Sequence, residues 1–157
     1  MEVLRLTAVT PDQVQTYWQT LYMHDTLKYR FCNIKEPNWS YVLSAIVAQG
    51  NHMFFVEDAG KLVAEFALEN FSGLAAQIHF SMHPDNDYRY SQKVAEFALA
   101  KVLTKFKTLW GSTPLLNRVA CMFVLNVGFK KLCIMPNSVN YMGKISDAMI
   151  SMRASNG

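Results

Sequence analysis

The stretch NRVACMFVLNVGF, residues 117–129, decides most of the fold that the sequence predicts. Its apolar positions recur at helical spacing and indicate one amphipathic helix, at Val119, Met122, Phe123 and Val127. Gly128 can take the left-handed conformation that ends a helix, and Phe129 stands where it would anchor the next strand in the core. The stretch therefore predicts a helix that ends at Gly128 and leads directly into a strand.

The residues before and after this helix predict further helices and strands. A capping box at Thr10 to Gln13, with Pro11 in the first helical position, opens a first helix, and Pro114 marks the start of the late helix. Strands are expected at 2–9, 52–58, 62–71, 74–83, 108–113, 129–135 and 143–153. Helices are expected at 11–24, 36–50, 91–107 and 114–128, and a loop is expected at 85–90. The order β-α-α-β-β-β-α-β-α-β-β indicates a mixed α/β fold.

Length and composition favour one globular domain, which we expect to span residues 1–153, with 154–157 as a disordered tail. The sequence has 157 residues, 51% of them hydrophobic. Cys32, Cys121 and Cys133 sit among apolar neighbours at spacings that fit neither a disulfide framework nor a zinc site, so buried thiols in a reducing compartment are expected. The N-terminus lacks a signal-peptide pattern and no apolar run is long enough to cross a bilayer, which predicts a cytoplasmic protein without membrane contact.

The charges and histidines argue against two classes of site. The net charge is only +3, and the densest basic cluster, Lys101, Lys105 and Lys107, lies at the end of one predicted helix. Such a cluster is typical of a solvated helix face, so nucleic-acid binding is not expected. His79 and His83 alone approach a metal-ligand spacing, and no third ligand lies near them in the sequence. No metal site is predicted.

The predicted strand 74–83 carries a polar stripe that contains a candidate base. Alternation places two sets of side chains on opposite faces, Gln77, His79, Ser81 and His83 on one and Ala76, Ile78, Phe80 and Met82 on the other. His79 has an unperturbed pKa near neutrality and could act as a general base; the alternative is a buried imidazole held by a hydrogen bond. Glu65 and Glu69, on the preceding strand, are alternative bases.

In this element order and in its late helix, the sequence resembles the GNAT superfamily of acyl-CoA-dependent N-acyltransferases. The family's late motif is roughly N-x-x-A-x-x-x-Y-x-x-x-G-F, and Asn117, Ala120, Gly128 and Phe129 fall at its spacing. The resemblance implies a central mixed, mostly antiparallel sheet flanked by helices, whose fourth and fifth strands splay apart. The cleft between them would be lined by His79, Phe80, Met82 and Asn117 and would take acetyl-CoA or another acyl-CoA as co-substrate, with Asn117 near the pantetheine arm.

The family binds the pyrophosphate of acyl-CoA on a loop R/Q-x-x-G-x-G/A that opens a helix, where backbone N–H groups and the helix dipole meet the phosphates. The matching stretch here is RYSQKV, residues 89–94. Arg89 and Lys93 keep positive charge beside the loop and Ser91 could cap the helix, whereas Gln92 and Val94 replace the glycines and their side chains can hinder the approach of a phosphate. The resemblance thus implies acyl-CoA contacts at all five positions; the alternative is an ordinary capped helix that binds nothing.

The resemblance also implies a reaction. Acyl transfer to an amine needs a base, and commonly an acid to protonate the leaving thiolate. The family's acid is commonly a Tyr four residues before the Gly of the late motif, a position that Val124 occupies here, so Tyr88, Tyr90 and Tyr141 are the substitutes. With His79 as the base, the predicted function is direct transfer of an acyl group from acyl-CoA to an unidentified amine.

A looser likeness provides the alternative function. Glycine-poor GNAT-like chains of this size, with IHF on the fourth strand, resemble small proteins of tailed bacteriophages and prophages, some of them head-assembly or internal virion proteins. This likeness implies a non-catalytic GNAT-fold phage protein that acts in virion assembly or as a binding module in the host cytoplasm, with a virion protein as partner. A homodimer is compatible with either function.

Overall fold

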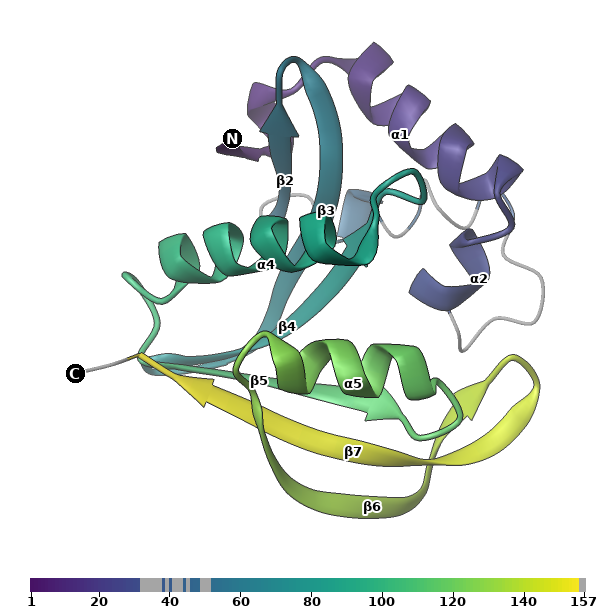
Figure 1. Cartoon of the computed structure of the whole chain (residues 1–157), viewed down its shortest axis with the longest axis vertical. Helices are drawn as coiled ribbons and strands as arrows, with labels where there is room; N and C mark the ends of the chain where they lie inside the picture. Colours follow the sequence, from purple (N-terminus) through teal and green to yellow (C-terminus); the bar gives the residue numbers. More distant parts are fainter. Residues whose placement is uncertain (32–37, 39, 41–43, 45, 49–51, 156–157) are drawn as a thin grey trace.

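The computed structural model describes residues 1–31, 38, 40, 44, 46–48 and 52–155. Its strands are β1 Glu2–Arg5, β2 Met53–Asp58, β3 Lys61–Ser72, β4 Ala75–Met82, β5 Thr108–Pro114, β6 Lys130–Tyr141 and β7 Lys144–Ala154. They form one seven-stranded sheet in the order β1-β2-β3-β4-β5-β7-β6. Its helices are the short 3-10 turn Leu6–Ala8, α1 Pro11–Met23, α2 Leu27–Arg30, α4 Tyr88–Val102 and α5 Arg118–Asn126 (Figure 1).

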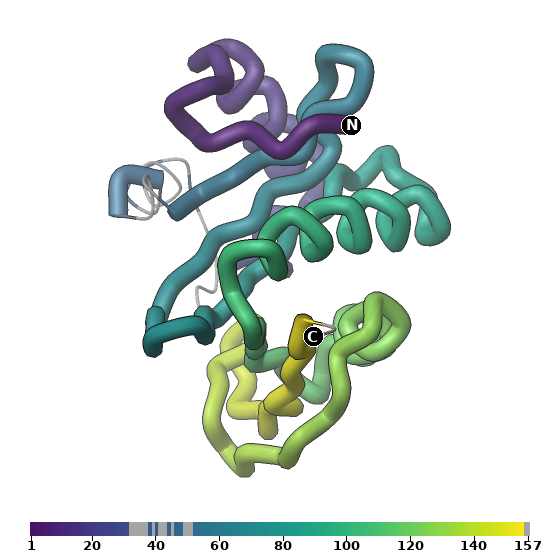
Figure 2. The backbone as a smooth tube through the Cα atoms, turned by 90° about the vertical axis from the view of Figure 1, so that its left-hand side faces the viewer, coloured from purple at the N-terminus to yellow at the C-terminus, as the bar shows by residue number. Residues whose placement is uncertain are grey.

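The sheet is mixed and mostly antiparallel, as the sequence predicted. Among the described strands, β4 and β5 are the one parallel pair, and the other neighbours run antiparallel. Figure 2 shows the two parts of the sheet, with the purple to teal N-terminal strands above and the green to yellow C-terminal strands below. The predicted mixed α/β architecture with flanking helices is therefore confirmed.

Helices cover both faces of the N-terminal part of the sheet. On one face, α1 buries Tyr17, Trp18 and Leu21 against Phe55 of β2. On the other face, α4 buries an apolar stripe that includes Val94, Ala98 and Leu99 against β3 and β4. Because both of its faces are covered, β3 is apolar along most of its length, and it forms the centre of the core.

The first helix begins where the capping box predicted. Gln13 N donates to Thr10 Oγ1 at 3.2 Å, and Thr10 N donates to Gln13 Oε1 at 2.9 Å. These two bonds satisfy donors that the first turn of a helix leaves free, and they end the extended segment that precedes it. The predicted strand 2–9 stops at Arg5, because Leu6–Ala8 turn toward this cap. The predicted helix 36–50 lies largely outside the described residues.

Two predicted helix starts differ from the structure. Pro114 does not open α5, because it is the last residue of β5 and pairs with Ala148 of β7. The helix begins instead at Arg118, after the cap Asn117. The predicted loop 85–90 is also too long, because α4 begins at Tyr88.

The C-terminal boundary also lies beyond the predicted one. Ala154 pairs with Thr108 in the sheet, and Ser155 N donates to Lys107 O at 2.8 Å. The ordered chain therefore continues past residue 153 at least to Ser155, while 156–157 lie outside the described residues.

The cysteines are less buried than predicted. Cys133 is exposed, because it lies on the edge strand β6, and Cys121 on α5 is half-buried. Burial is nonetheless enough to raise the pKa of the Cys121 thiol, whose Sγ lies 3.5 Å from Pro114 O. Both thiols are free, and Cys32 lies outside the described residues.

Candidate active site

The central feature of the site is a cleft between β4 and β5. The two strands pair only at Ala75–Thr108, Ala76–Leu109 and Gln77–Trp110, and beyond Gln77 they diverge. The gap holds a cavity of about 870 Å³, which is lined by the free ends of both strands and by the N-terminal turns of α4 and α5. The predicted splay of the fourth and fifth strands is therefore confirmed.

The helix α5 forms one wall of this cleft. Asn117 caps it, because Asn117 Oδ1 accepts a hydrogen bond from Ala120 N at 3.1 Å. At the other end, Gly128 N donates to Leu125 O and Phe129 N donates to Val124 O, around a Gly128 φ of 89°. The predicted stop at Gly128 is thus confirmed.

The predicted apolar stripe of α5 is confirmed for half of its residues. Val127 is buried and Phe123 packs against the core, whereas Val119 and Met122 are exposed, at 70% and 63% of their surface. Phe123, Val124 and the exposed Val119 line the cleft. Phe129 is buried, and its ring meets the ring of Phe80 edge to face with 6.3 Å between centroids. The aromatic anchor predicted after Gly128 therefore joins α5 to the cleft floor.

The polar stripe of β4 lies beside a second polar stripe on β3. The strand register places Glu65 opposite Ser81, and Glu69 opposite Gln77. Tyr17 of α1 donates from its hydroxyl to Ser81 O at 2.8 Å, and Asn70 Nδ2 donates to Gln77 Oε1 at 2.6 Å. Polar groups of the stripe thus find partners on neighbouring elements, which keeps the face compatible with burial.

Arg30 neutralises the most buried acid of this face. Glu65 has no exposed surface, and Arg30 Nε donates to Glu65 Oε2 at 2.9 Å while Arg30 Nη2 donates to Glu65 Oε1 at 3.1 Å. Two parallel bonds from a guanidinium to a carboxylate are among the strongest polar contacts in proteins. Glu65 is therefore held as an ion-pair partner, which argues against its role as the base.

His79 is the titratable group that this arrangement leaves at the cleft. It lines the cavity, and its Nε2 contacts Glu69 Oε1. Burial, and then the positive charge of Arg30, hold the pKa of His79 below its ordinary value, although Glu69 acts in the opposite direction. A histidine with a lowered pKa is neutral near pH 7 and has a lone pair with which to accept a proton.

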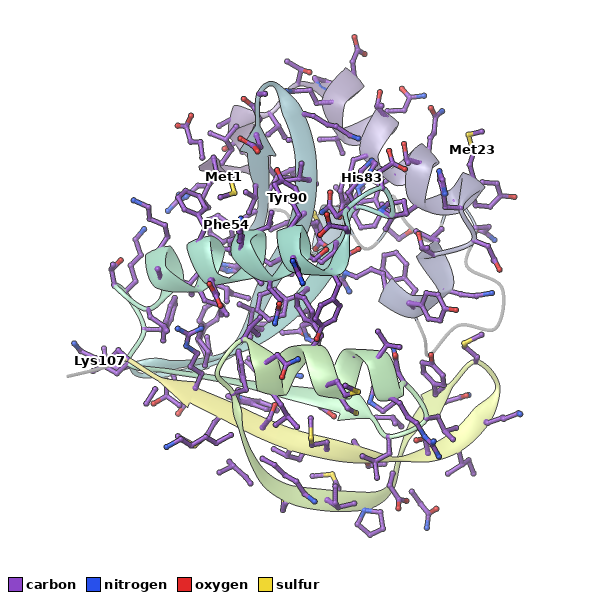
Figure 3. All side chains as sticks on the ribbon, in the orientation of Figure 1. Met1, Met23, Phe54, His83, Tyr90 and Lys107 are labelled. Carbon is purple, nitrogen blue, oxygen red and sulfur yellow. The ribbon has the colours of Figure 1, made fainter. Side chains whose placement is uncertain are left out.

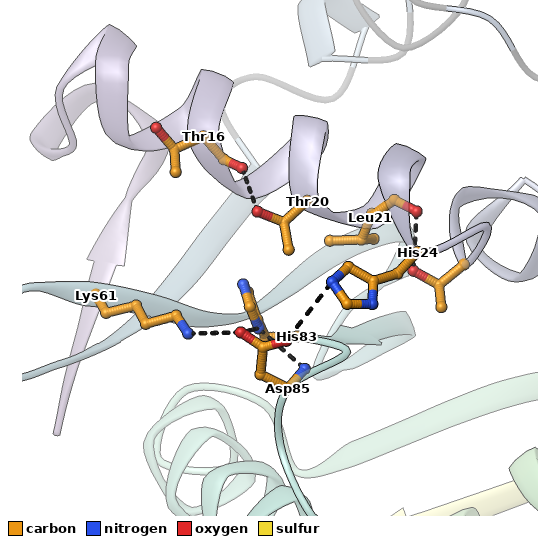
Figure 4. A network of polar contacts seen from close by, with 8 residues as sticks. Thr16, Thr20, Leu21, His24, Lys61, His83 and Asp85 are labelled. Carbon is orange, nitrogen blue, oxygen red and sulfur yellow. Dashed lines mark hydrogen bonds and ion pairs between the residues drawn. The ribbon is translucent and has the colours of Figure 1, made fainter.

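The loop between β4 and α4 is fixed by a polar network around Asp85 (Figure 4). Lys61 Nζ donates to Asp85 Oδ2 at 3.1 Å, and His24 Nε2 lies 3.7 Å from Asp85 Oδ1. Asp85 N donates to His83 Nδ1 at 3.2 Å, so this nitrogen carries no proton. Burial, and then the charge of Lys61, lower the pKa of His83. The network holds the start of α4 at the mouth of the cleft.

The start of α4 differs from the predicted phosphate loop. Asp87 caps the helix, because its Oδ1 accepts from Tyr90 N at 2.8 Å, and the predicted cap Ser91 instead donates its backbone N–H to Asp87 O at 2.9 Å. Residues 89–94 therefore lie inside the helix. A carboxylate thus occupies the helix end at which the resemblance implied a pyrophosphate.

The predicted acyl-CoA contacts fall into two groups. His79, Phe80, Met82, Ser91 and Asn117 all line the cleft. The others do not line it: Arg89 and Lys93 are exposed, Gln92 is half-buried, and Val94 is buried in the core under α4. The structure brings together the strand residues, Asn117 and Ser91 of the predicted site and leaves the other four helix positions outside it.

The predicted substitute acids divide in the same way. Tyr88 and Tyr141 line the cleft, as does Val124 at the family's Tyr position. Tyr90 instead donates from its hydroxyl to Asp58 Oδ2 at 2.5 Å, and burial together with this bond raises the pKa of Tyr90 to about 12. Tyr90 is therefore not placed to protonate a group in the cleft.

Sequence reasoning missed three residues of this region. Arg30 lies on the short helix α2, where the apolar pattern had already faded at His24 and Asp25, so no signal marked it. Tyr17 lies on the apolar side of the first helix, a position that indicates core packing and gives no sign of its hydrogen bond to Ser81. Asp87 had a usable signal, since an Asp three residues before a helical N–H is a common cap.

No protein-family profile and no curated protein matches this sequence, but solved structures do. The spermidine N-acetyltransferase of Vibrio cholerae, solved with CoA and spermine, superposes with a TM-score of 0.76 at 13% identity, over 98% of this chain and 94% of that one. The fold is that of the GNAT acetyltransferases. A GNAT-family acetyltransferase of Bacillus anthracis gives 0.74 at 13% identity, over 99% and 95% of the two chains.

A third GNAT-fold neighbour is RimJ of Mycobacterium smegmatis, solved with CoA-disulfide. It gives a TM-score of 0.73 at 12% identity, over 94% of this chain and 79% of that one. At such identities the likeness shows the GNAT fold alone. The predicted relation to phage proteins finds no support in these comparisons.

Two classes of feature are missing from the described part of the GNAT-fold chain. None of its helices is long and apolar enough to cross a membrane. Among the same residues, no three His, Cys, Asp or Glu side chains gather in a way that could hold a metal ion.

The two lowered histidine pKa values predict a loss of stability on mild acidification. The ordinary His pKa is 6.5, and both His79 and His83 lie below it when folded, so the unfolded chain binds more protons below pH 6.5. The contribution of these two neutral histidines to the free energy of unfolding is complete above pH 6.5 and is lost as the pH falls toward their pKa values in the folded protein. We expect the urea midpoint to fall between about pH 7.5 and 5.5, a window above most carboxylate titrations.

A variant pair tests this pH dependence. His83→Gln removes one of the two groups and should flatten the dependence of the urea midpoint on pH. Thr20→Ala, which removes a side chain without a titrating group from the facing helix α1, is the control and should leave the slope as it is in the wild type. A wild-type slope in His83→Gln would show that His83 does not titrate between the folded and unfolded states as its burial implies.

Proposed function

We propose that this chain is an N-acyltransferase that binds acyl-CoA in the cleft between β4 and β5 and transfers the acyl group to an amine. The observation that carries the proposal is His79, a histidine with a lowered pKa on the wall of the cleft at the point where the two strands have parted. The fold supports it, since the neighbours named above include acetyltransferases solved with CoA.

The proposed chemistry needs no covalent intermediate. The amine nitrogen attacks the thioester carbonyl, the nitrogen–carbon bond forms, the carbon–sulfur bond breaks, and His79 takes the amine proton. A proton on Nε2 suits the adjacent Glu69 carboxylate and leaves Nδ1 as the accepting nitrogen. Tyr88 or Tyr141, both at the cleft, would supply the proton for the leaving thiolate.

Calorimetric titration with acetyl-CoA and a thiol-release assay test this function directly. We expect acetyl-CoA to bind well below a dissociation constant of about 1 mM, or about −4 kcal/mol, and thiol to be released with at least one amine from a panel. Binding without release with any amine would favour a binding module. A dissociation constant of about 1 mM or weaker would contradict both the enzyme and the acyl-CoA-binding module.

A non-catalytic binding module is the second candidate, and the start of α4 favours it. Asp87 places a negative charge where GNAT enzymes bind pyrophosphate, and side chains at Gln92 and Val94 stand where the family has glycines. Asp87→Asn tests the effect of the negative charge apart from that of the missing glycines, because Asn is as good a cap as Asp but carries no charge. If acyl-CoA phosphates meet this helix end, the variant should bind acetyl-CoA several-fold, about threefold or more, more tightly.

The control for this variant is Asp12→Asn, which removes an acidic residue from the first turn of α1. It should leave the acetyl-CoA dissociation constant unchanged, and both variants should unfold at nearly the wild-type urea concentration. Unchanged acetyl-CoA affinity in Asp87→Asn would place the phosphates elsewhere and would rule out contacts at the start of α4.

A further inference from the structure

A second cavity lies apart from the acyl-CoA cleft, between the N-terminal strands and the C-terminal end of α4. Its volume is about 920 Å³, which is within the size range of small-molecule sites, and it shares no lining residue with the cleft. Phenylalanines from several elements line it, namely Phe54, Phe66, Phe71, Phe97 and Phe106. In Figure 3, Phe54 lies near Met1, which also lines this cavity.

Four of the lining phenylalanines form two ring pairs. Phe54 and Phe66 face each other across β2 and β3 and stack with 5.3 Å between ring centroids. Phe71 and Phe106 lie 5.6 Å apart, and Phe71 keeps 45% of its surface exposed. A group of rings that remains half-open to solvent offers apolar area that a ligand could bury.

Cations from two different elements converge on the rim. Arg5 of β1 pairs with Phe54 in the sheet, and its guanidinium lies 6.0 Å from the centre of that ring. Lys101 lies in the last turn of α4, and Lys105 lies in the turn that follows this helix. Lysines in this place would suit the helix dipole by themselves, but Arg5 has no part in that helix. The helix dipole therefore does not explain why all three cations lie beside this cavity.

These cations have no acidic partner in the described part of the chain. Among the residues that the structure describes, none of Arg5, Lys101 and Lys105 forms an ion pair, and Glu2 is the one carboxylate on the lining. An uncompensated positive rim around an apolar floor complements a molecule with an apolar body and an anionic end.

We propose that this second cavity binds a small anionic amphiphile, with the apolar chain of a carboxylate such as a medium-chain fatty acid against the phenylalanines and the carboxylate at Arg5, Lys101 and Lys105. The basic cluster that the sequence indicated as a solvated helix face then has a ligand. The proposal is independent of the acyl-transfer reaction, because the two cavities are lined by different residues.

Calorimetric titration with decanoate, 1-decanol and decylamine tests the proposal. We expect decanoate to bind about tenfold more tightly than either of the other two, since all three share the apolar chain and differ in charge. The double variant Lys101→Glu, Lys105→Glu should weaken decanoate about tenfold or more and leave decanol within about twofold. The matched control is Lys130→Glu, Lys131→Glu on the exposed edge strand β6, which makes the same change in charge away from the cavity.

The possible outcomes distinguish binding in the second cavity from binding in the acyl-CoA cleft and from a general effect of net charge. Decanoate binding that saturating acetyl-CoA leaves unchanged, and that only the α4 double variant weakens, would support the second cavity. Equal weakening by both double variants would show a general effect of net charge and overturn the proposal. A decanoate dissociation constant of about 1 mM or weaker in the wild type, or displacement of decanoate by acetyl-CoA, would overturn it too. Unchanged urea midpoints of both double variants ensure that the comparison is made on folded protein.

Discussion

The variant His79→Gln should lose about 10²-fold or more of its turnover while binding acetyl-CoA as the wild type does. Glutamine keeps a hydrogen-bonding side chain of similar size at the cleft wall but cannot take a proton from the amine. The measurement is steady-state thiol release with the best amine of the panel, together with calorimetric titration of acetyl-CoA. Full turnover in this variant would exclude His79 as the base.

Two further variants define the role of the histidine. Cys121→Ala should keep nearly full turnover, because burial raises the pKa of this thiol and keeps it protonated, so it is not a nucleophile. Glu69→Gln should move the acidic limb of the kcat/KM pH profile to lower pH, because the Glu69 carboxylate raises the pKa of His79. A profile that does not move would mean that Glu69 supports the fold without tuning the base.

Arg30→Met should destabilise the protein by about 3–5 kcal/mol, because it leaves the fully buried Glu65 carboxylate without its partner. Lys28→Met is the matched control on the same short helix. Lys28 pairs with the exposed Asp25, and its loss should move the urea midpoint far less. The measurement is the free energy of unfolding in urea for the two variants and the wild type.

A double variant shows whether the destabilisation comes from the unpaired charge. Arg30→Met combined with Glu65→Leu removes both buried charges and should recover much of the lost stability, since apolar pairs often replace a buried ion pair at little cost. If Arg30→Met alone unfolds at the same urea concentration as Lys28→Met, the pair contributes no more than a surface contact and the prediction is wrong.

The candidate site could be predicted only in part, and the difference lies in how local each signal is. The alternation of β4 placed His79 on a polar face from the sequence alone, because side-chain direction in a strand has a period of two. Asn117 was found because it falls at the spacing of the family's late motif, whereas its role as the cap of α5 was missed because the helix start was predicted at Pro114. Arg30 could not be found, since it reaches Glu65 across 35 positions of sequence and lies on a helix of four residues.

The predicted phosphate loop shows how weak a partial motif is as a guide to backbone conformation. Of the motif's defined positions only Arg89 matches in the stretch 89–94, and the stretch lies inside α4, because Asp87 accepts from Tyr90 N and starts the helix early. Which of several polar residues caps a helix depends on the path of the preceding loop. That path is set here by His83, Asp85 and Lys61, which come from separate parts of the sheet and its loops.

The sequence by itself determined the order of strands and helices, the capping box of α1, the stop of α5 at Gly128 and the polar face of β4, because each of these depends on neighbours within a few positions. Only the tertiary structure decided that β4 and β5 part after Gln77, which opens the cleft, that Arg30 neutralises Glu65, and that His79, the proposed base, lies at the cleft wall. The physical reason is that strand separation, burial and charge pairing depend on contacts between distant segments, and these lower or raise a pKa only once the chain has folded.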